Sequence, residues 1–140
     1  MSLTLHHCHD ARSMRTLWLL REIGLEFELV IHGFDRSLRA PEFLKVSPAG
    51  RVPALVHNGQ ALIETGAITE YLCETFETPL FRPPGDPERV EWLTWLHYAE
   101  TLGQHLAILT QQHIVLRKDC LLYTSPSPRD QRGSRMPSSA

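Results

Sequence analysis

Apolar positions along the first third of the chain predict a strand, a helix and a second strand. Residues 3–7 are a short apolar start that suits a strand. From Met14 to Gly24, apolar residues recur at helical spacing and form one broad face. Asp10 or Ser13 is expected to cap the start of this helix, and Gly24 suits the position after its end. Apolar and acidic residues alternate from residue 26 onward, which predicts the second strand.

The next segment predicts a hairpin followed by a helix. Residues 33–44 are charged and irregular, with one helical turn expected at 41–44. Two short apolar runs flank Asn58-Gly59, which is the strongest two-residue hairpin signal. Apolar residues then recur at helical spacing as far as Phe76. The order of these elements predicts an α/β fold in which helices pack against a mixed four-stranded sheet.

A proline-rich stretch divides this first unit, residues 1–81, from a long helix. Residues 82–86 form a stiff linker, and Pro87 fits the first position of a helix that Asp86 can cap. The helix is expected to reach about Lys118 and carries an apolar stripe that a single helix cannot bury. We therefore expect residues 87–119 to be part of an incomplete all-α domain.

The amino-acid composition changes abruptly in the last 21 residues, 120–140. They have no periodic apolar positions, so we expect them to be disordered. The run from Cys120 to Arg129 also resembles translated adapter or vector sequence. We therefore expect a truncated chain whose tail is not native, with few partners for the long helix.

Composition excludes several classes of protein. A net charge of −2 gives no reason to expect nucleic acid as a partner, and no apolar run approaches the ~20 residues that cross a membrane. The N-terminus lacks the basic and apolar segments of a secretion signal. Three widely spaced cysteines, with no Cys-x-x-Cys pair, support neither a zinc ribbon nor a dithiol motif. A cytoplasmic setting is expected.

The most informative stretch is 46–55, followed by the segment 64–68. A Val52-Pro53 bond that opens a short strand can be locked in the cis form, because this form costs only ~0.5–1 kcal/mol before proline. The kink turns the backbone N–H and C=O of Val52 outward, where they can pair with an extended peptide. The N-terminus of the helix that follows Glu64 suits a carboxylate. Together these features predict a pocket for a small peptide that carries a free carboxylate.

At these motifs, from Leu3 to Lys118, the chain resembles the cytosolic glutathione transferase superfamily. The resemblance implies a thioredoxin-like N-terminal domain that binds glutathione, then a helical domain that supplies most of the electrophile pocket. It implies an enzyme that adds the glutathione thiolate to a hydrophobic electrophilic small molecule, with glutathione as co-substrate and no metal. Members of the superfamily are usually homodimers, so we expect a homodimer of the full-length protein.

The resemblance also assigns roles in binding glutathione. Val52 would pair its backbone with the cysteinyl part, and Pro53 would be the cis proline. Thr65 and the helix N-terminus would take the γ-glutamyl carboxylate, and Glu64 would face the amine. Arg51, and as a second candidate Arg39, would pair with the glycine carboxylate. Tyr98 is a candidate for the pocket of the second substrate.

The thiol-activating group has two candidates near the start of the first helix. Ser13 is the first choice, because a hydroxyl donor at a helix N-terminus can favour the thiolate. Cys8 is the alternative, as the nucleophile of a glutathione-dependent thiol-disulfide oxidoreductase if its pKa were lowered. A non-catalytic glutathione-binding module is also open. Of the nearby histidines, only His7 and His9 can converge, and no carboxylate at metal-ligand spacing reinforces them.

Overall fold

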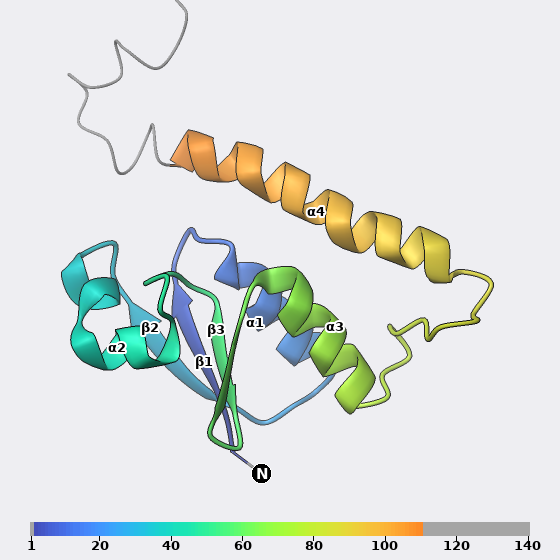
Figure 1. The fold of residues 1–140 in the computed structure, drawn as a ribbon, viewed down its shortest axis with the longest axis horizontal. Helices are drawn as coiled ribbons and strands as arrows, with labels where there is room; N and C mark the ends of the chain where they lie inside the picture. The colour runs from blue at the N-terminus through green and yellow to red at the C-terminus, as the bar shows by residue number, and fades with distance from the viewer. Residues whose placement is uncertain (1, 111–140) are drawn as a thin grey trace, which may run out of the picture. The chain divides into compact units, whose positions relative to one another are not determined.

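The computed structural model of the chain describes residues 2–110. Four strands form one sheet in the order β2-β1-β3-β4. The strands are β1 (Leu3–Cys8), β2 (Glu28–His32), β3 (Ala54–His57) and β4 (Gln60–Ile63). β1 pairs with β2 in parallel, whereas β3 is antiparallel to both β1 and β4. The predicted mixed sheet and thioredoxin-like fold are therefore confirmed, and the hairpin turns at the residues that the sequence indicated (Figure 1).

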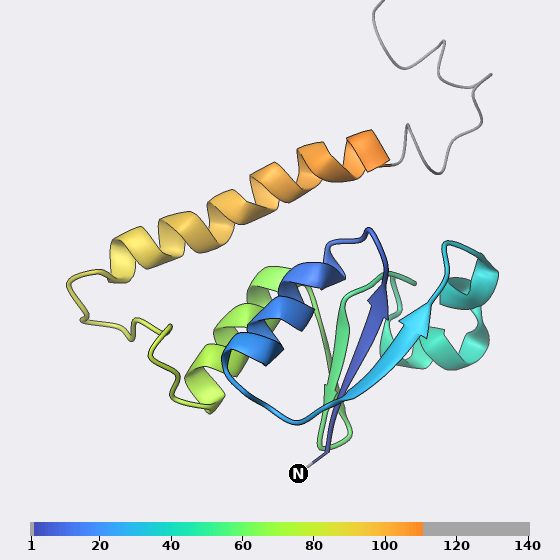
Figure 2. The same cartoon turned by 180° about the vertical axis from the view of Figure 1, so that it is seen from behind.

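Helices pack on both faces of this sheet. α1 (Ser13–Glu22) and α3 (Thr65–Thr75) lie beside each other on one face, as Figure 2 shows from behind. α2 (Pro41–Val46) approaches the other face through Phe43, whose ring lies 4.6 Å from that of His32 between centroids. A 3-10 turn, Arg36–Arg39, precedes α2 where only an irregular segment was expected. Its start is fixed by the Asp35 carboxylate, which accepts a hydrogen bond from the backbone of Ser37 at 2.7 Å.

The expected capping residue of α1 was wrong, although the helix starts within one residue of the prediction and Gly24 follows its end as predicted. Arg12 occupies the N-cap without a side-chain cap hydrogen bond, so neither Asp10 nor Ser13 caps the helix. The Ser13 hydroxyl instead bonds to the end of β1. Gly24 follows the last turn with φ of +70°, a left-handed conformation that glycine adopts without steric cost.

The long helix α4 (Arg89–Thr110) begins two residues later than the sequence indicated. A turn precedes it, in which the Asp86 carboxylate accepts a hydrogen bond from the backbone of Glu88 at 2.7 Å. The predicted continuation to Lys118 and the predicted disorder of residues 120–140 lie outside the described residues. Among the described helices, none is both long and apolar enough to cross a membrane.

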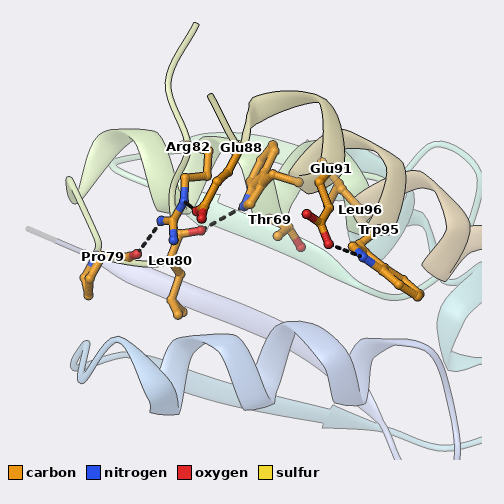
Figure 3. A pocket seen from close by; sticks show the side chains of 9 residues that line it. Thr69, Pro79, Leu80, Arg82, Glu88, Glu91, Trp95 and Leu96 are labelled. Carbon is orange, nitrogen blue, oxygen red and sulfur yellow. Dashed lines mark hydrogen bonds and ion pairs between the residues drawn. The ribbon is translucent and has the colours of Figure 1, made fainter. Parts of the chain in front are cut away.

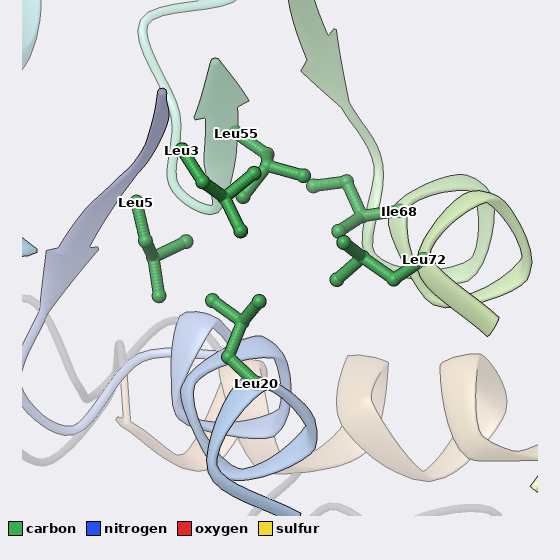
Figure 4. Packing of buried hydrophobic residues seen from close by; sticks show 6 residues of the cluster. All are labelled: Leu3, Leu5, Leu20, Leu55, Ile68 and Leu72. Carbon is green, nitrogen blue, oxygen red and sulfur yellow. The ribbon is translucent and has the colours of Figure 1, made fainter. Parts of the chain in front are cut away.

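The core lies between the sheet and the pair α1 and α3. Leucines of two strands meet residues from both helices, and their aliphatic side chains point toward one another (Figure 4). Burial of this kind stabilises the fold by roughly 1.5–3 kcal/mol for each large apolar side chain. The core residues are Leu3, Leu5, Leu20, Leu55, Ile68 and Leu72.

We predict that Leu20→Ala lowers the free energy of unfolding by about 2–5 kcal/mol, because Leu20 is fully buried and truncation leaves a cavity. Trp18 lies on the same helix but is 67% exposed, so Trp18→Ala should cost less than about 1 kcal/mol. Urea denaturation followed by circular dichroism measures both. Equal losses for the two variants would contradict the assignment of the core.

Candidate functional site

A narrow cleft opens at the edge of the sheet where β1 and β4 end and β3 begins. Its walls come from the start of α1, the loop between α2 and β3, and the junction of β4 with α3. Five predicted site residues, including Val52 and Thr65, therefore meet in one place. The residues that line the cleft are Arg12, Ser47, Ala49, Arg51, Val52, Pro53, Ile63, Glu64 and Thr65.

The loop from Ser47 to Pro53 is held by its own polar groups. The buried Ser47 hydroxyl donates to the Arg51 carbonyl at 2.9 Å and accepts from the Arg51 backbone N–H at 3.2 Å. The Val52-Pro53 peptide bond is cis, as predicted. Sequence reasoning overlooked Ser47, although it opens the Ser-Pro-Ala-Gly-Arg segment that carried the prediction.

Arg39 has a supporting position rather than a place in the cleft wall. Its guanidinium donates to the Ala49 carbonyl at 3.1 Å, so it supports the backbone of the loop from Ser47 to Pro53. Arg51, by contrast, is exposed and lines the cleft. Of the two arginines predicted to meet a carboxylate, the structure therefore brings only Arg51 to the other predicted residues.

The junction of β4 with α3 places backbone donors at the cleft. Glu64 is the N-cap of α3, with φ of 73° and no side-chain cap hydrogen bond. This left-handed conformation costs a non-glycine residue on the order of 1–3 kcal/mol and is typical of functional sites. Thr65 begins the helix and is almost fully buried. The first turn of α3 has no acidic residue, which leaves its N–H groups and positive dipole end available to an anion.

The start of α1 presents a different group to the cleft than the sequence indicated. Ser13 is fully buried, and its hydroxyl lies 2.8 Å from His7 Nδ1 and 3.2 Å from both the backbone N and O of Cys8. The Ser13 hydroxyl is therefore hydrogen-bonded inside the fold. Among the described residues of α1 and the turn before it, Arg12 alone lines the cleft.

Cys8 lacks the environment of a reactive thiol. Its side chain is buried, and burial raises the pKa of the thiol, with smaller contributions in the same direction from Asp10 and Asp35. A nucleophilic cysteine needs the opposite shift, toward the thiolate.

The histidines near the site pack in pairs. The rings of His7 and His9 meet edge-to-face at 5.4 Å, and burial, followed by the charge of His9, lowers the pKa of His7. On the opposite face of the sheet, His6 Nδ1 lies 2.9 Å from His32 Nε2. Within residues 2–110, no cluster of three or more His, Cys, Asp or Glu side chains is placed to hold a metal ion.

A second, larger pocket of about 520 Å³ lies between α3, the linker and the start of α4 (Figure 3). Several of its polar groups are hydrogen-bonded to one another: Arg82 Nε donates to Glu88 at 2.7 Å, and Trp92 Nε1 donates to the Leu80 carbonyl at 2.8 Å. Tyr98 lines neither this pocket nor the cleft, and its ring packs edge-to-face on Trp95 at 5.9 Å. The structure therefore does not bring Tyr98 together with the other predicted site residues.

Comparison with known proteins identifies the family. The model of the glutathione S-transferase N-terminal domain matches residues 1–74, which is more than half of the chain. The chain therefore belongs to this family. Glutathione S-transferase 3 of Schizosaccharomyces pombe is 31% identical over 100 residues, covering 70% of this chain and 41% of the relative. The chain spans less than half the length of the curated relatives that it matches.

Solved structures agree with this assignment. A glutathione transferase from Methylococcus capsulatus is 36% identical, with a TM-score of 0.61 over 71% of this chain and 51% of that one. The glutathione transferase URE2P6 from Phanerochaete chrysosporium, in complex with oxidised glutathione, is 26% identical, with a TM-score of 0.71 over 94% and 60% of the two chains.

We predict that stability falls on acidification partly through the His6 and His32 pair. Burial, followed by the charge of His32, lowers the pKa of His6 below 6.5, and Glu28 opposes this shift. The unfolded state therefore binds more protons, so the contribution is present above pH 6.5 and is lost as pH falls toward the folded pKa. His6→Gln should make the free energy of unfolding depend less steeply on pH between about pH 7 and about pH 5. His97→Gln, at an exposed position of α4, is the control. An unchanged slope for His6→Gln would refute this.

The cleft loop also yields a prediction at Gly50, where φ is +59° and an added Cβ would lie 2.7 Å from the Leu38 carbonyl. Gly50→Ala should lower stability by about 2–5 kcal/mol, because the conformational cost and steric overlap add. Gly59 has a similar φ of +83° with no atom within 4 Å, so Gly59→Ala should cost only about 1–2 kcal/mol. Thermal unfolding of the two variants measures both losses. Equal losses would contradict the close approach of the loop backbone at Gly50 to the Leu38 carbonyl.

Proposed function

We propose that the cleft binds glutathione and that, in the longer transferase, it presents the thiolate to an electrophile. One observation supports this above the others: the edge formed by Val52 and the cis Pro53 faces the uncapped first turn of α3 within a single cleft. A kinked backbone edge can pair with a short extended peptide, and a helix N-terminus can take its carboxylate.

The groups that line the cleft support one arrangement of the tripeptide. The backbone of Val52 pairs with the cysteinyl residue. Thr65 and the N–H groups after it take the γ-glutamyl carboxylate, and Glu64 faces the amine. Arg51 makes a charge-assisted bond with the glycine carboxylate. Arg39 acts through the loop backbone, since its guanidinium is bonded to the Ala49 carbonyl.

The proposed reaction is conjugation. The glutathione thiol loses its proton to solvent, and its sulfur forms a bond to an electrophilic carbon of a hydrophobic small molecule. Either a leaving group departs from that carbon with the bonding electron pair, or the sulfur adds across an activated double bond and the resulting carbanion takes a proton from solvent. The protein contributes positioning and stabilisation of the thiolate. Ser13 can serve as the hydroxyl donor only if it leaves its bonds to His7 and Cys8. The raised pKa of Cys8 weighs against the oxidoreductase alternative. The homodimer and the cytoplasmic setting of the longer protein belong to the same proposal.

The burial of Ser13 favours a second candidate function, a glutathione-binding module that lacks a thiol activator. Ultraviolet absorbance of the thiolate distinguishes the two. An enzyme of this kind should lower the pKa of the bound thiol, so the thiolate band should grow on binding near neutral pH. Binding without that growth would favour the module.

Titration calorimetry with reduced glutathione tests the binding itself. We predict that Thr65→Val weakens binding about fivefold to tenfold, because it removes one hydroxyl hydrogen bond to the carboxylate without changing side-chain shape. Thr69 lies one turn later on α3, where its hydroxyl donates to the Thr65 carbonyl at 2.8 Å. Thr69→Val should therefore change the affinity less than about twofold. No heat with the unmodified chain would refute the proposed function.

A further inference from the structure

Arg12 lies at the cleft and also contacts α4. It lines the cleft, and its Nη1 lies 3.5 Å from Glu100 Oε2 on α4. The other oxygen of the same carboxylate lies 2.9 Å from Arg15 Nη2. One carboxylate of α4 therefore pairs with two guanidinium groups at the start of α1, those of the N-cap Arg12 and of Arg15, across 85 to 88 residues of sequence.

Gly103 lets α4 approach these arginines closely. It is the buried residue of α4, and it follows Glu100 by three positions, so both lie on one face of the helix. A Cβ at Gly103 would lie 3.1 Å from Arg12 Cδ and 3.2 Å from Arg15 Nη2. The glycine therefore leaves room for the two side chains to lie close to α4.

We propose that Arg12 is a further glutathione-binding residue, and that Glu100 and Gly103 of α4 position its guanidinium at the cleft. This inference rests on the proposed function. The guanidinium would contact an anionic group of the tripeptide, either the thiolate or a carboxylate. α4 is then a component of the glutathione site and not only a neighbour of it.

The chemistry of the pair supports positioning over stability. A guanidinium has five N–H donors, and Glu100 approaches one nitrogen of Arg12, so donors remain for a ligand. Both side chains are about one third exposed, and ion pairs of this kind contribute little to stability. Since Ser13 is buried, Arg12 is the side chain that the start of α1 offers to the cleft.

A double-mutant cycle on the full chain tests this, with calorimetry and reduced glutathione. Arg12→Gln should weaken binding about fivefold to tenfold, and Glu100→Gln about threefold. In the Arg12→Gln background, Glu100→Gln should have no further effect. The direction in which Glu100→Gln changes the affinity is diagnostic. If Glu100 had no positioning role, loss of its negative charge would strengthen the binding of anionic glutathione. Tighter binding by Glu100→Gln, or additive losses, would overturn the inference.

Three controls separate positioning from general damage. Glu91→Gln changes an exposed carboxylate of α4 and should leave the affinity unchanged. Arg15→Gln removes the shorter ion pair without removing a residue that lines the cleft, so it should change the affinity less than about twofold. Glu100→Asp should restore part of the affinity that Glu100→Gln loses. Melting temperatures measured alongside show that each variant is folded.

S-methylglutathione, which cannot form a thiolate, identifies the group that Arg12 contacts. If the contact is the thiolate, the loss caused by Arg12→Gln disappears with this ligand, and if it is a carboxylate, the loss persists. Unmodified protein that binds glutathione while Arg12→Gln binds equally well would overturn this inference alone. Unmodified protein that binds no glutathione would remove the proposed function, and this inference with it.

Discussion

The burial of α1 and α3 on one face of the sheet is the constraint on which the site depends. β1 and β4 are each antiparallel to β3, so their ends and the beginning of β3 lie at the same edge. Each of these two strands leads into a helix that must return over the sheet to bury Leu20 or Leu72. Both helix starts and the loop before β3 therefore meet at that edge. The apolar core thus determines where the polar cleft forms.

Two buried serines fix the backbone at this edge in the same manner. Ser13 bonds to both the N–H and the C=O of Cys8, and Ser47 does so with Arg51. A buried backbone group without a partner costs roughly as much as a lost hydrogen bond, so each hydroxyl supplies partners where the chain leaves regular structure. This explains why Ser13 is not presented at the cleft, although its place in the sequence suits a thiol activator.

The parts of the molecule that local sequence determines were predictable. The Asn58-Gly59 hairpin, the cis bond before Pro53 and the helix that begins at Thr65 each follow from a few adjacent residues. The orientation of Ser13 was not predictable, because a serine near a helix start suits a cap, a catalytic group or a backbone partner equally. The contact of Arg12 with Glu100 was also beyond reach, since no local pattern joins residues 88 positions apart.

The two faces of α4 explain why its role at the site is separable from its packing elsewhere. Glu100 and Gly103 face α1, whereas Trp95, Tyr98 and Leu102 recur on another side and remain largely exposed. Exposed apolar area of this kind favours association with other surfaces, and none of these three residues lines the cleft. A polar substitution on the exposed side should therefore alter association, and a substitution at Glu100 should alter the position of Arg12. Because the two sets lie on different sides of the helix, their effects should be close to additive.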